Sequence, residues 1–277
     1  MRRASHKTMP PLNLALVGCG KMGSALLNGW IKGKIEADFT VINPSPLSFS
    51  LPRSVYYASS VQSAAARLAK ADMIVLAVKP QIMAGICADL KPLVPETALI
   101  LSIAAGKTIQ SFEQVFGPAQ PVIRVMPNTP AAIGKGASVA VANKNTSPDD
   151  KARTTRLLEC AGTLDWLEDE SLLDAVTALS GSGPAYLFYL IEVLSEAGIR
   201  NGLPPDLSVK LARQTVIGAA ALAEENPETD AATLRQNVTS PGGTTEAALK
   251  VLMNGEMQDI FEKALSAARD RGKALNQ

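Results

Sequence analysis

A glycine-rich turn near the amino terminus constrains the fold of this chain more than any other feature. Leu12 to Gly18 is a short apolar run typical of a buried strand, and it leads directly into Gly18-Cys19-Gly20-Lys21-Met22-Gly23. An amphipathic helix is expected to follow, from about Ser24 to Lys32. The spacing G-x-G-x-x-G between a strand and a helix is the fingerprint of a dinucleotide-binding domain. The alternative is a glycine-rich turn in an α/β domain of another kind.

Each glycine of this fingerprint has its own expected role. Gly18 makes the tight turn, Gly20 lets a pyrophosphate approach the backbone, and Gly23 lets the helix pack closely on the strand. The unpaired N–H groups at the start of the helix favour an anion there. The predicted cofactor-binding residues of the turn are Gly18, Gly20, Lys21, Met22 and Gly23.

The end of the second expected strand, Phe39 to Ile42, indicates which dinucleotide is bound. An NAD site usually places an Asp or Glu about 20 residues beyond the fingerprint, where it holds the ribose 2′-hydroxyl. Here Asn43 and Ser45 occupy this place. They can donate hydrogen bonds to a 2′-phosphate, which a carboxylate would repel. NADP(H) is therefore favoured as the cofactor, with NAD(H) as the alternative.

Strand-like and helical patterns alternate up to about residue 167, which predicts an α/β fold with a parallel doubly wound sheet. Further strands are expected over 73–78, 98–103, 122–126, 137–142 and 163–167, and helices over 61–70, 81–90, 109–116 and 148–161. The ligand crevice of such a sheet lies at the carboxyl ends of its strands. The segments that follow three of these strands are Lys79-Pro80, Ala104-Ala105-Gly106 and Pro127-Asn128-Thr129-Pro130. Each could be a simple strand terminator, but together they predict the nicotinamide side of a cofactor site.

From about Glu168 only helical periodicity remains, so a domain boundary is expected at 164–172. We predict a disordered tail over 1–11, a dinucleotide-binding domain over 12–167 and an all-helical domain over 168–277. Its first helices are expected over 171–179, 184–197 and 206–225, and the last of these carries a run of small residues from Gly218 to Ala221. This helical half is too thin to fold convincingly as an independent globular domain. Its apolar faces are expected to meet another copy of the chain in a homodimer or a larger assembly.

Two expected helices of the second half are joined by a turn rich in hydroxyls, Val238-Thr239-Ser240-Pro241-Gly242-Gly243-Thr244-Thr245. Pro241 stops the first helix, the two glycines leave the backbone bare, and a new helix begins near Thr244. The N–H groups of that helix start, with the hydroxyls of Ser240, Thr244 and Thr245, suit a small anion. The alternative is a sharp turn whose hydroxyls are only helix caps.

Histidine usage limits the chemistry. The only histidine is His6 in the expected tail, so a Ser-His-Asp triad, a histidine metal site and the histidine acid of many hydroxy-acid dehydrogenases all lack their residue. A ketone needs such an acid during reduction, because an alkoxide would otherwise form. A chain of this composition is therefore poorly suited to the reduction of a ketone.

Composition also bears on partners and location. A net charge of +1 and 4% aromatic residues argue against nucleic-acid binding, and no apolar run approaches the ~20 residues of a membrane helix. Leu16-Val17-Gly18-Cys19 imitates a lipoprotein cleavage box, but the fingerprint explains its glycine better. Cys19, Cys87 and Cys160 are too widely spaced for a disulfide framework or a metal knuckle. A cytoplasmic location is expected.

Several different motifs follow one another in a specific order along nearly the whole chain. After the fingerprint come Val78-Lys79-Pro80, Met126-Pro127-Asn128-Thr129-Pro130, Ala178-Leu179-Ser180-Gly181-Ser182-Gly183-Pro184-Ala185-Tyr186, Gly202-Leu203-Pro204, Gln214-Thr215 with Gly218-Ala219-Ala220, and the hydroxyl-rich turn 238–245. Together they resemble the pyrroline-5-carboxylate reductase family, and the last motifs are highly specific.

This resemblance implies reduction of 1-pyrroline-5-carboxylate to L-proline with NAD(P)H, the last step of proline biosynthesis. The implied substrate is a cyclic imine, which solvent can protonate and whose cation accepts hydride without a general acid, provided that the reacting carbons are held ~3.5 Å apart. The lack of a histidine in the expected domains agrees with such a substrate. The resemblance also implies that Thr245 acts near the ring nitrogen as the catalytic residue. The implied substrate-binding residues are Val238, Ser240, Gly242, Gly243, Thr244 and Thr245. The implied cofactor-binding residues are 20–23, Asn43, Ala77, Val78, Lys79, Pro80 and Ala105. The segment after the strand expected over 122–126 adds Asn128, and the argument about the 2′-phosphate adds Ser45. Family members form dimers and often pentamers of dimers.

Two rival functions stay open. A β-hydroxy-acid dehydrogenase has a similar two-domain outline but uses a lysine of the interdomain helix as its acid, and the helix expected over 184–197 contains none. A non-catalytic NADP-binding sensor would need the crevice alone. It would have no reason to keep two separate substrate-side motifs.

Overall fold

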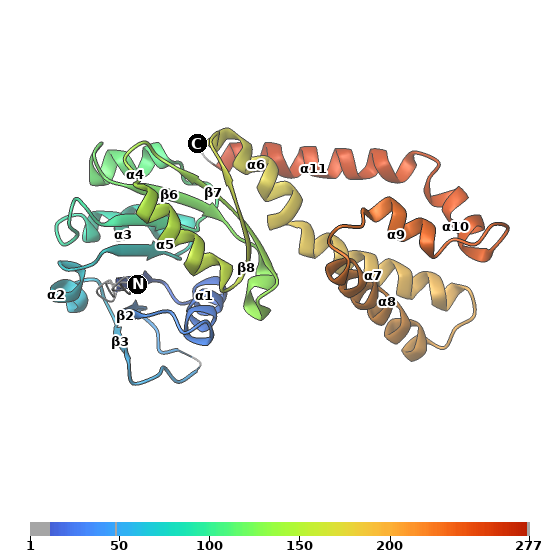
Figure 1. Ribbon diagram of the computed structural model, residues 1–277, viewed down its shortest axis with the longest axis horizontal. Coiled ribbons are helices and arrows are strands. Elements are labelled where there is room, and N and C mark those ends of the chain that lie inside the picture. The colour runs from blue at the N-terminus through green and yellow to red at the C-terminus, as the bar shows by residue number, and fades with distance from the viewer. Residues whose placement is uncertain (1–11, 48, 276–277) are drawn as a thin grey trace, which may run out of the picture. The chain divides into compact units, whose positions relative to one another are not determined.

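The computed structural model describes residues 12–47 and 49–275, so the tail predicted over 1–11 lies outside the described residues. The chain forms two compact units (Figure 1). The first comprises Met1–Gly181 with Arg269–Gln277, and the second comprises Ser182–Ala268. The domain boundary predicted between residues 167 and 168 falls at the end of the last strand of the sheet, not at the division between the two units. It remains a prediction.

An eight-stranded sheet in the order β3-β2-β1-β4-β5-β6-β7-β8 forms the centre of the first unit. Its strands are β1 Leu12–Val17, β2 Ala37–Ile42, β3 Val55–Ala58, β4 Met73–Leu76, β5 Leu99–Ser102, β6 Val122–Met126, β7 Gly136–Ala142 and β8 Gly162–Leu167. All neighbouring pairs are parallel except β6 and β7. The predicted doubly wound α/β class is confirmed.

Helices cover both faces of this sheet, because side chains alternate between the faces along each strand. The helical segments of this unit before residue 182 are α1 Lys21–Lys32, η1 Gln62–Ala64, α2 Ala65–Leu68, η2 Pro80–Ile82, α3 Met83–Leu90, α4 Ile109–Phe116, η3 Thr129–Ile133, α5 Pro148–Glu159, η4 Glu170–Leu172, α6 Leu173–Val176 and the π-helical η5 Thr177–Gly181. One buried cluster joins the sheet to α1 and α5, and a second joins it to α2, α3 and α4.

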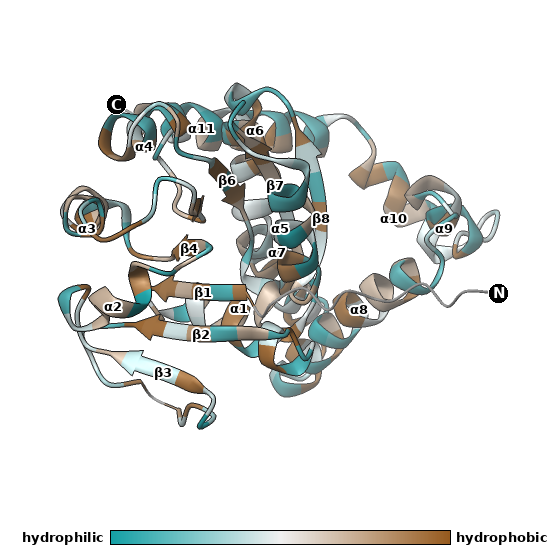
Figure 2. Ribbon diagram, turned by 60° about the vertical axis from the view of Figure 1, so that its left-hand side comes forward, coloured by the Kyte–Doolittle hydropathy of each residue, from teal (hydrophilic) through white to brown (hydrophobic). Residues whose placement is uncertain are grey.

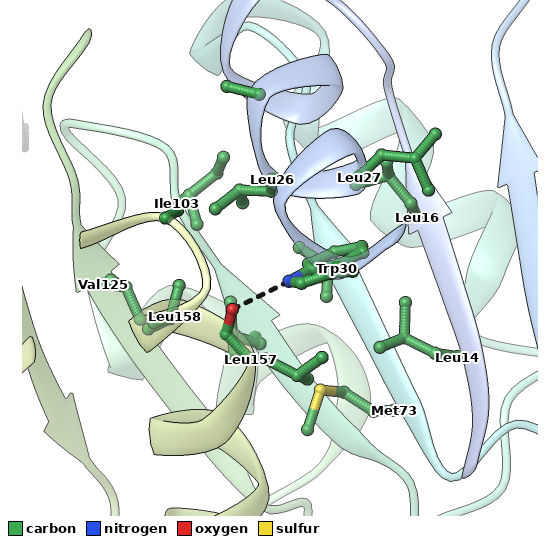
Figure 3. Close-up of a cluster of buried hydrophobic side chains, with 14 of the residues drawn as sticks. Leu14, Leu16, Leu26, Leu27, Trp30, Met73, Ile103, Val125, Leu157 and Leu158 are labelled. Atoms are coloured by element: carbon green, nitrogen blue, oxygen red, sulfur yellow. Dashed lines mark hydrogen bonds between the residues drawn. The ribbon is translucent and has the colours of Figure 1, made fainter. Parts of the chain in front are cut away.

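Trp30 of α1 lies at the centre of the first cluster (Figure 3). Its ring is 1% exposed and stacks on Phe39, with 6.0 Å between the centroids. The indole Nε1 donates to the carbonyl of Leu157 in α5 at 3.0 Å, so the one polar atom of this side chain is satisfied. This packing fixes α1, and with it the glycine turn at its start.

The second unit is helical, as expected. It contains α7 Gly183–Arg200, α8 Pro205–Glu225, α9 Ala231–Asn237, α10 Thr244–Leu252 and the greater part of α11 Glu256–Leu275. The helices α7 and α8 pack together, and the hydroxyl of Ser208 donates to the carbonyl of Ser195 at 2.7 Å. Within the described part of this unit, only Ser195, Ser208 and Ala212 are buried. None of the described helices of the chain is long and apolar enough to span a bilayer.

Four details differ from the sequence prediction. The strand β3 was not predicted, and β7 runs antiparallel to β6 because only the short η3 joins them, whereas a parallel pair needs a longer crossover. The first helix begins at Lys21 rather than Ser24. The helix expected over 171–179 is divided into 3₁₀, α and π segments.

Candidate active site

The crevice of the sheet lies where the strand order diverges. From β1 the chain continues to β2 and β3 on one side, and β4 and later strands lie on the other. Gly18 follows β1 and donates its N–H to the carbonyl of Ile42 at 2.8 Å. Ala77 follows β4 and donates to Val17 at 2.8 Å. Ligands of open α/β sheets bind at such a switch point, at the carboxyl ends of the strands.

The three fingerprint glycines differ in what a side chain would meet. Gly18 has a φ of +91°, and an added Cβ would lie 2.7 Å from the carbonyl oxygen of Ala77. At Gly23 the Cβ would lie 2.3 Å from the carbonyl oxygen of Gly18. At Gly20 it would meet no protein atom within 4 Å. These contacts agree with a tight turn, a close helix–strand approach and a backbone left open for a ligand.

The start of α1 is suited to an anion. Gly20 is the N-cap residue, no side chain caps the helix, and the first turn holds no acidic residue. The first backbone bond into the helix runs from Ser24 N–H to the carbonyl of Gly20 at 2.9 Å. The N–H groups of Lys21, Met22 and Gly23 therefore have no partner within the helix, and the helix dipole adds a partial positive charge.

A cavity of about 560 Å³ opens beside this turn, which is within the usual range for a small-molecule site. It brings together seven of the predicted cofactor residues, namely Gly18, Gly20, Asn43, Ser45, Ala77, Val78 and Lys79. The other six, Lys21, Met22, Gly23, Pro80, Ala105 and Asn128, do not line it. The sequence prediction missed Ser59, Ser60 and Gln62, which also line it and follow β3. Recognition of β3 would have found them, since polar residues at the carboxyl end of a strand are the signal.

Asn43 braces the loops around this cavity. Its Oδ1 accepts from the backbone N–H of Cys19 at 3.0 Å, and its Nδ2 donates to the carbonyl of Ser45 at 2.7 Å. The hydroxyl of Tyr57 donates to the carbonyl of Asn43 at 2.7 Å. One hydrogen of the Asn43 amide remains available for a ligand. A 2′-phosphate contact at this residue stays a prediction.

Asn128 also holds backbone in place. Its side chain accepts from the N–H of Ala137 at 2.8 Å and donates to the carbonyl of Ser180 at 3.1 Å. It therefore ties the end of β6 to β7 and to the last turn of η5. The cofactor role predicted for Asn128 stays untested, and the observed role is structural.

Cys19 lies inside the fingerprint but is no nucleophile at neutral pH. Burial raises the pKa of its thiol to about 11. The thiolate is the reactive form of cysteine, so this side chain is inert at pH 7. Only the backbone of Cys19 takes part in the turn, through the bond to Asn43.

The hydroxyl-rich turn of the second unit leads into α10 as predicted. Gly242 has a φ of +70°, and the N–H of Gly243 donates to the carbonyl of Ser240 at 3.0 Å. Gly243 is the N-cap of α10, and no side chain caps that helix. Within the described residues, the hydroxyls of Ser240, Thr244 and Thr245 make no hydrogen bond, so they are not helix caps.

One charged residue of this turn was missed. The carboxylate of Glu246 accepts the backbone N–H of Gly242, and Lys250 lies 3.0 Å from its other oxygen. The hydrogen bond from Gly242, and then the one from Lys250, lowers the pKa of Glu246. Two signals could have found it: a glutamate in the first turn of a helix, and a lysine four residues later.

Comparison with known proteins gives consistent matches along the chain. A family model for pyrroline-5-carboxylate reductase dimerisation matches residues 170–275, and one for NADP oxidoreductase, coenzyme F420-dependent, matches residues 13–106. A pyrroline-5-carboxylate reductase of Pseudomonas aeruginosa is 40% identical, over 95% of this chain and 96% of its own length. The structure of a pyrroline-5-carboxylate reductase from Coxiella burnetii has a TM-score of 0.88 at 37% identity, covering 96% and 99% of the two chains. The pyrroline carboxylate reductase of Plasmodium falciparum with NADP bound has a TM-score of 0.81 at 32% identity, covering 97% and 100%.

Proposed function

The chain belongs to the pyrroline-5-carboxylate reductase family, and we propose that it reduces 1-pyrroline-5-carboxylate to L-proline with NADPH. It is an NAD(P)H-dependent oxidoreductase. The relatives at 33–40% identity that carry this name support the substrate. The Plasmodium falciparum relative with NADP bound supports the cofactor.

The residues at the carboxyl end of the sheet fit NADPH, which when bound supplies a hydride to the substrate. The backbone at Gly20 is open on the side where a pyrophosphate would lie, and the N–H groups of Lys21 to Gly23 would donate to it. Asn43 and Ser45 would hold the 2′-phosphate. Ala77, Val78, Lys79, Pro80, Ala105 and Asn128 complete the proposed cofactor set.

The turn 238–245 would hold the substrate carboxylate. Ser240, Gly242, Gly243 and Thr244 supply hydroxyl and backbone donors, and Thr245 would orient the ring nitrogen. Val238, which is 61% exposed, offers an apolar side chain to the ring. The single observation that carries this assignment is the set of hydroxyls at a helix start that have no partner among the described residues.

The chemistry needs little from the protein beyond positioning. A protonated imine is already an electrophile. No side chain has to donate a proton during hydride transfer, whereas reduction of a ketone needs a general acid for the carbonyl oxygen. The task of the turn is to fix the ring by its charge and to orient its nitrogen. The described residues contain no histidine, and this reaction does not call for one.

A direct test follows imine-dependent oxidation of NADPH and NADH, and proline-dependent reduction of the oxidised cofactors at alkaline pH. We expect Thr245→Ala to lower kcat/KM for the imine by about 10- to 100-fold, the range of a lost hydrogen bond to a charged group. Ser240→Ala is expected to raise KM chiefly. Thr239→Ala is the matched control, because the Thr239 hydroxyl already donates to the carbonyl of Arg235 at 2.7 Å.

Unchanged kcat/KM in both Ser240→Ala and Thr245→Ala would rule out the turn as the substrate site. Activity with a β-hydroxy acid and none with the imine would favour the dehydrogenase alternative. Tight NADP binding without turnover would favour a sensor.

We also propose that the chain works in the cytoplasm as a homodimer or a pentamer of dimers, with residues 168–277 as the substrate-binding and dimerisation domain. The dimerisation match over 170–275 and the many exposed apolar side chains of α7 and α8 support the assembly. The three unpaired cysteines suit a reducing compartment.

A further inference from the structure

The backbone at the proposed substrate turn already holds an anion, which is the carboxylate of Glu246. This carboxylate accepts the N–H of Gly242, one of the donors proposed to bind the substrate carboxylate. Both groups carry one negative charge and both would use the same donor. They cannot occupy it together without repulsion.

The contact differs from an ordinary capping box. In that motif a glutamate at the third helical position accepts from the N-cap N–H, while a hydroxyl of the N-cap residue caps the helix in return. Here the N-cap is Gly243, which has no hydroxyl, and Glu246 reaches past it to Gly242. The nearby hydroxyls of Ser240, Thr244 and Thr245 remain without partners in the described part of the chain. The turn is therefore only partly satisfied by its own residues.

Lys250 offers Glu246 a second partner one helical turn along α10. Its Nζ lies 3.0 Å from the Glu246 carboxylate, and both side chains are on the surface, at 74% and 35% exposure. An exposed ion pair of this kind contributes little to stability. It does provide a position to which the Glu246 carboxylate can withdraw when another anion takes the Gly242 N–H.

We propose that Glu246 is a specificity-determining residue of the substrate turn, whose carboxylate holds the Gly242 N–H until the substrate carboxylate displaces it toward Lys250. This inference rests on the proposed function and deepens it. Glu246 then sets how tightly the turn binds any ring acid, substrate and product alike. A turn without it would bind both more tightly.

Glu246→Gln is the first test, because glutamine keeps an oxygen that can accept the Gly242 N–H but removes the charge. We expect KM for 1-pyrroline-5-carboxylate and the inhibition constant of L-proline to fall by the same factor, about three- to tenfold, with kcat unchanged. L-Prolinamide, which lacks the carboxylate, should inhibit wild type and variant equally. A purely structural role predicts the opposite result, a rise in KM together with a lower melting temperature, and that result would overturn the proposal.

Lys250→Met gives the second test and moves KM in the other direction. Without Lys250, the Glu246 carboxylate has only the Gly242 N–H as a partner, so KM should rise about two- to fivefold. In the Glu246→Gln background, Lys250→Met should leave KM unchanged. If Lys250→Met raised KM equally in both backgrounds, Lys250 would attract the substrate directly and the proposal would be wrong.

Failure of this inference can be separated from failure of the proposed function. The Thr245→Ala and Ser240→Ala variants decide whether the turn binds substrate at all. If they impair turnover while Glu246→Gln leaves KM unchanged, the function stands and only the role of Glu246 falls.

Discussion

Gly20 and Gly23 allow the same substitution to test two different roles. An alanine methyl at Gly20 would meet no protein atom within 4 Å, and its φ of −73° suits any residue. We therefore expect Gly20→Ala to lower the free energy of unfolding by no more than about 1 kcal/mol, the cost of alanine in place of glycine at a helix N-cap. The methyl would instead occupy space needed by the pyrophosphate, so KM for NADPH should rise about tenfold, equal to about 1.4 kcal/mol.

Gly23→Ala is the matched variant. Its methyl would lie 2.3 Å from the backbone oxygen of Gly18, which cannot move without opening the turn. We expect a loss of at least about 2 kcal/mol in urea denaturation. Equal stability loss in the two variants would show that the open space at Gly20 is not reserved for a ligand.

The buried thiol of Cys87 makes stability depend on pH in the alkaline range. Burial raises its pKa to about 11, against an opposing effect of Lys107, from an ordinary value of 9.0. The unfolded chain therefore loses this proton first, and the stabilising contribution present below pH 9 is lost as pH rises to about 11. The most that one such group can contribute is about 2.7 kcal/mol.

The measurement compares urea denaturation of wild type and Cys87→Ala at pH 8 and pH 11. The other groups that titrate at alkaline pH are common to both proteins. The difference between the two proteins in how steeply the free energy of unfolding falls with pH therefore reports on Cys87 alone. We expect the variant to lose less stability over this range. Cys160→Ala serves as control, because Cys160 is more exposed and should change the slope less. Parallel slopes for wild type and Cys87→Ala would contradict the assignment.

At the residue scale, the sequence pointed to Asn43 and Asn128 as residues that follow strands, but it did not predict their hydrogen-bond partners. Asn43 and Asn128 were predicted near a cofactor from their place after strands. Their hydrogen bonds to Cys19 and Ser180 join segments that are far apart in the chain. Such contacts depend on tertiary geometry, which periodicity does not contain.

Among the elements, β6 and η4 are joined by a buried ion pair. Arg124 of β6 lies 2.8 Å from Glu170, with side chains 6% and 26% exposed. Glu170 also accepts the N–H of Ile109 at the start of α4. Removal of Glu170 would leave a buried guanidinium unpaired, so Glu170→Ala should cost about 2–3 kcal/mol in urea denaturation.

Two comparison variants make this prediction specific. Glu170→Gln keeps an acceptor for Ile109 and should cost less than Glu170→Ala. Glu196→Ala removes an exposed pair with Arg200 and should cost less than about 0.5 kcal/mol. If Glu170→Ala and Glu196→Ala cost the same, the pair does not hold η4 to the sheet.

The elements that sequence reasoning missed are short or depend on connectivity. The strand β3 has four residues, Val55 to Ala58, too few for a period to be recognised, although its valine and tyrosines favour a strand. The direction of β7 depends on the length of its connection to β6, and η3 carries no strong helical pattern. Helices with strong patterns, such as α4 and α8, were predicted to within one residue at each end.

At the scale of the whole molecule, the two units differ in how they bury apolar residues. The first unit has two large buried clusters. In the second unit, hydrophobic residues occur along α8 and α10 (Figure 2). Among them, Leu211, Leu222 and Val251 are 47%, 49% and 70% exposed. Apolar surface of this extent usually marks a protein interface. Helical periodicity correctly predicted that this half is helical, but it could not show which faces of its helices remain uncovered.

We expect the protein in solution to have at least twice the chain mass of 29.1 kDa, as measured by sedimentation velocity. Leu222 lies one helical turn beyond Gly218, on the same face of α8 as this small residue. A carboxylate there would be buried without a partner in an assembly, so Leu222→Asp should release monomers. Ile133→Asp in η3 is the control, because Ile133 is 76% exposed in the first unit and should leave the mass unchanged. A wild-type protein that sediments as a monomer at micromolar concentration, or a Leu222→Asp variant with the wild-type mass, would exclude this face of α8 from the interface.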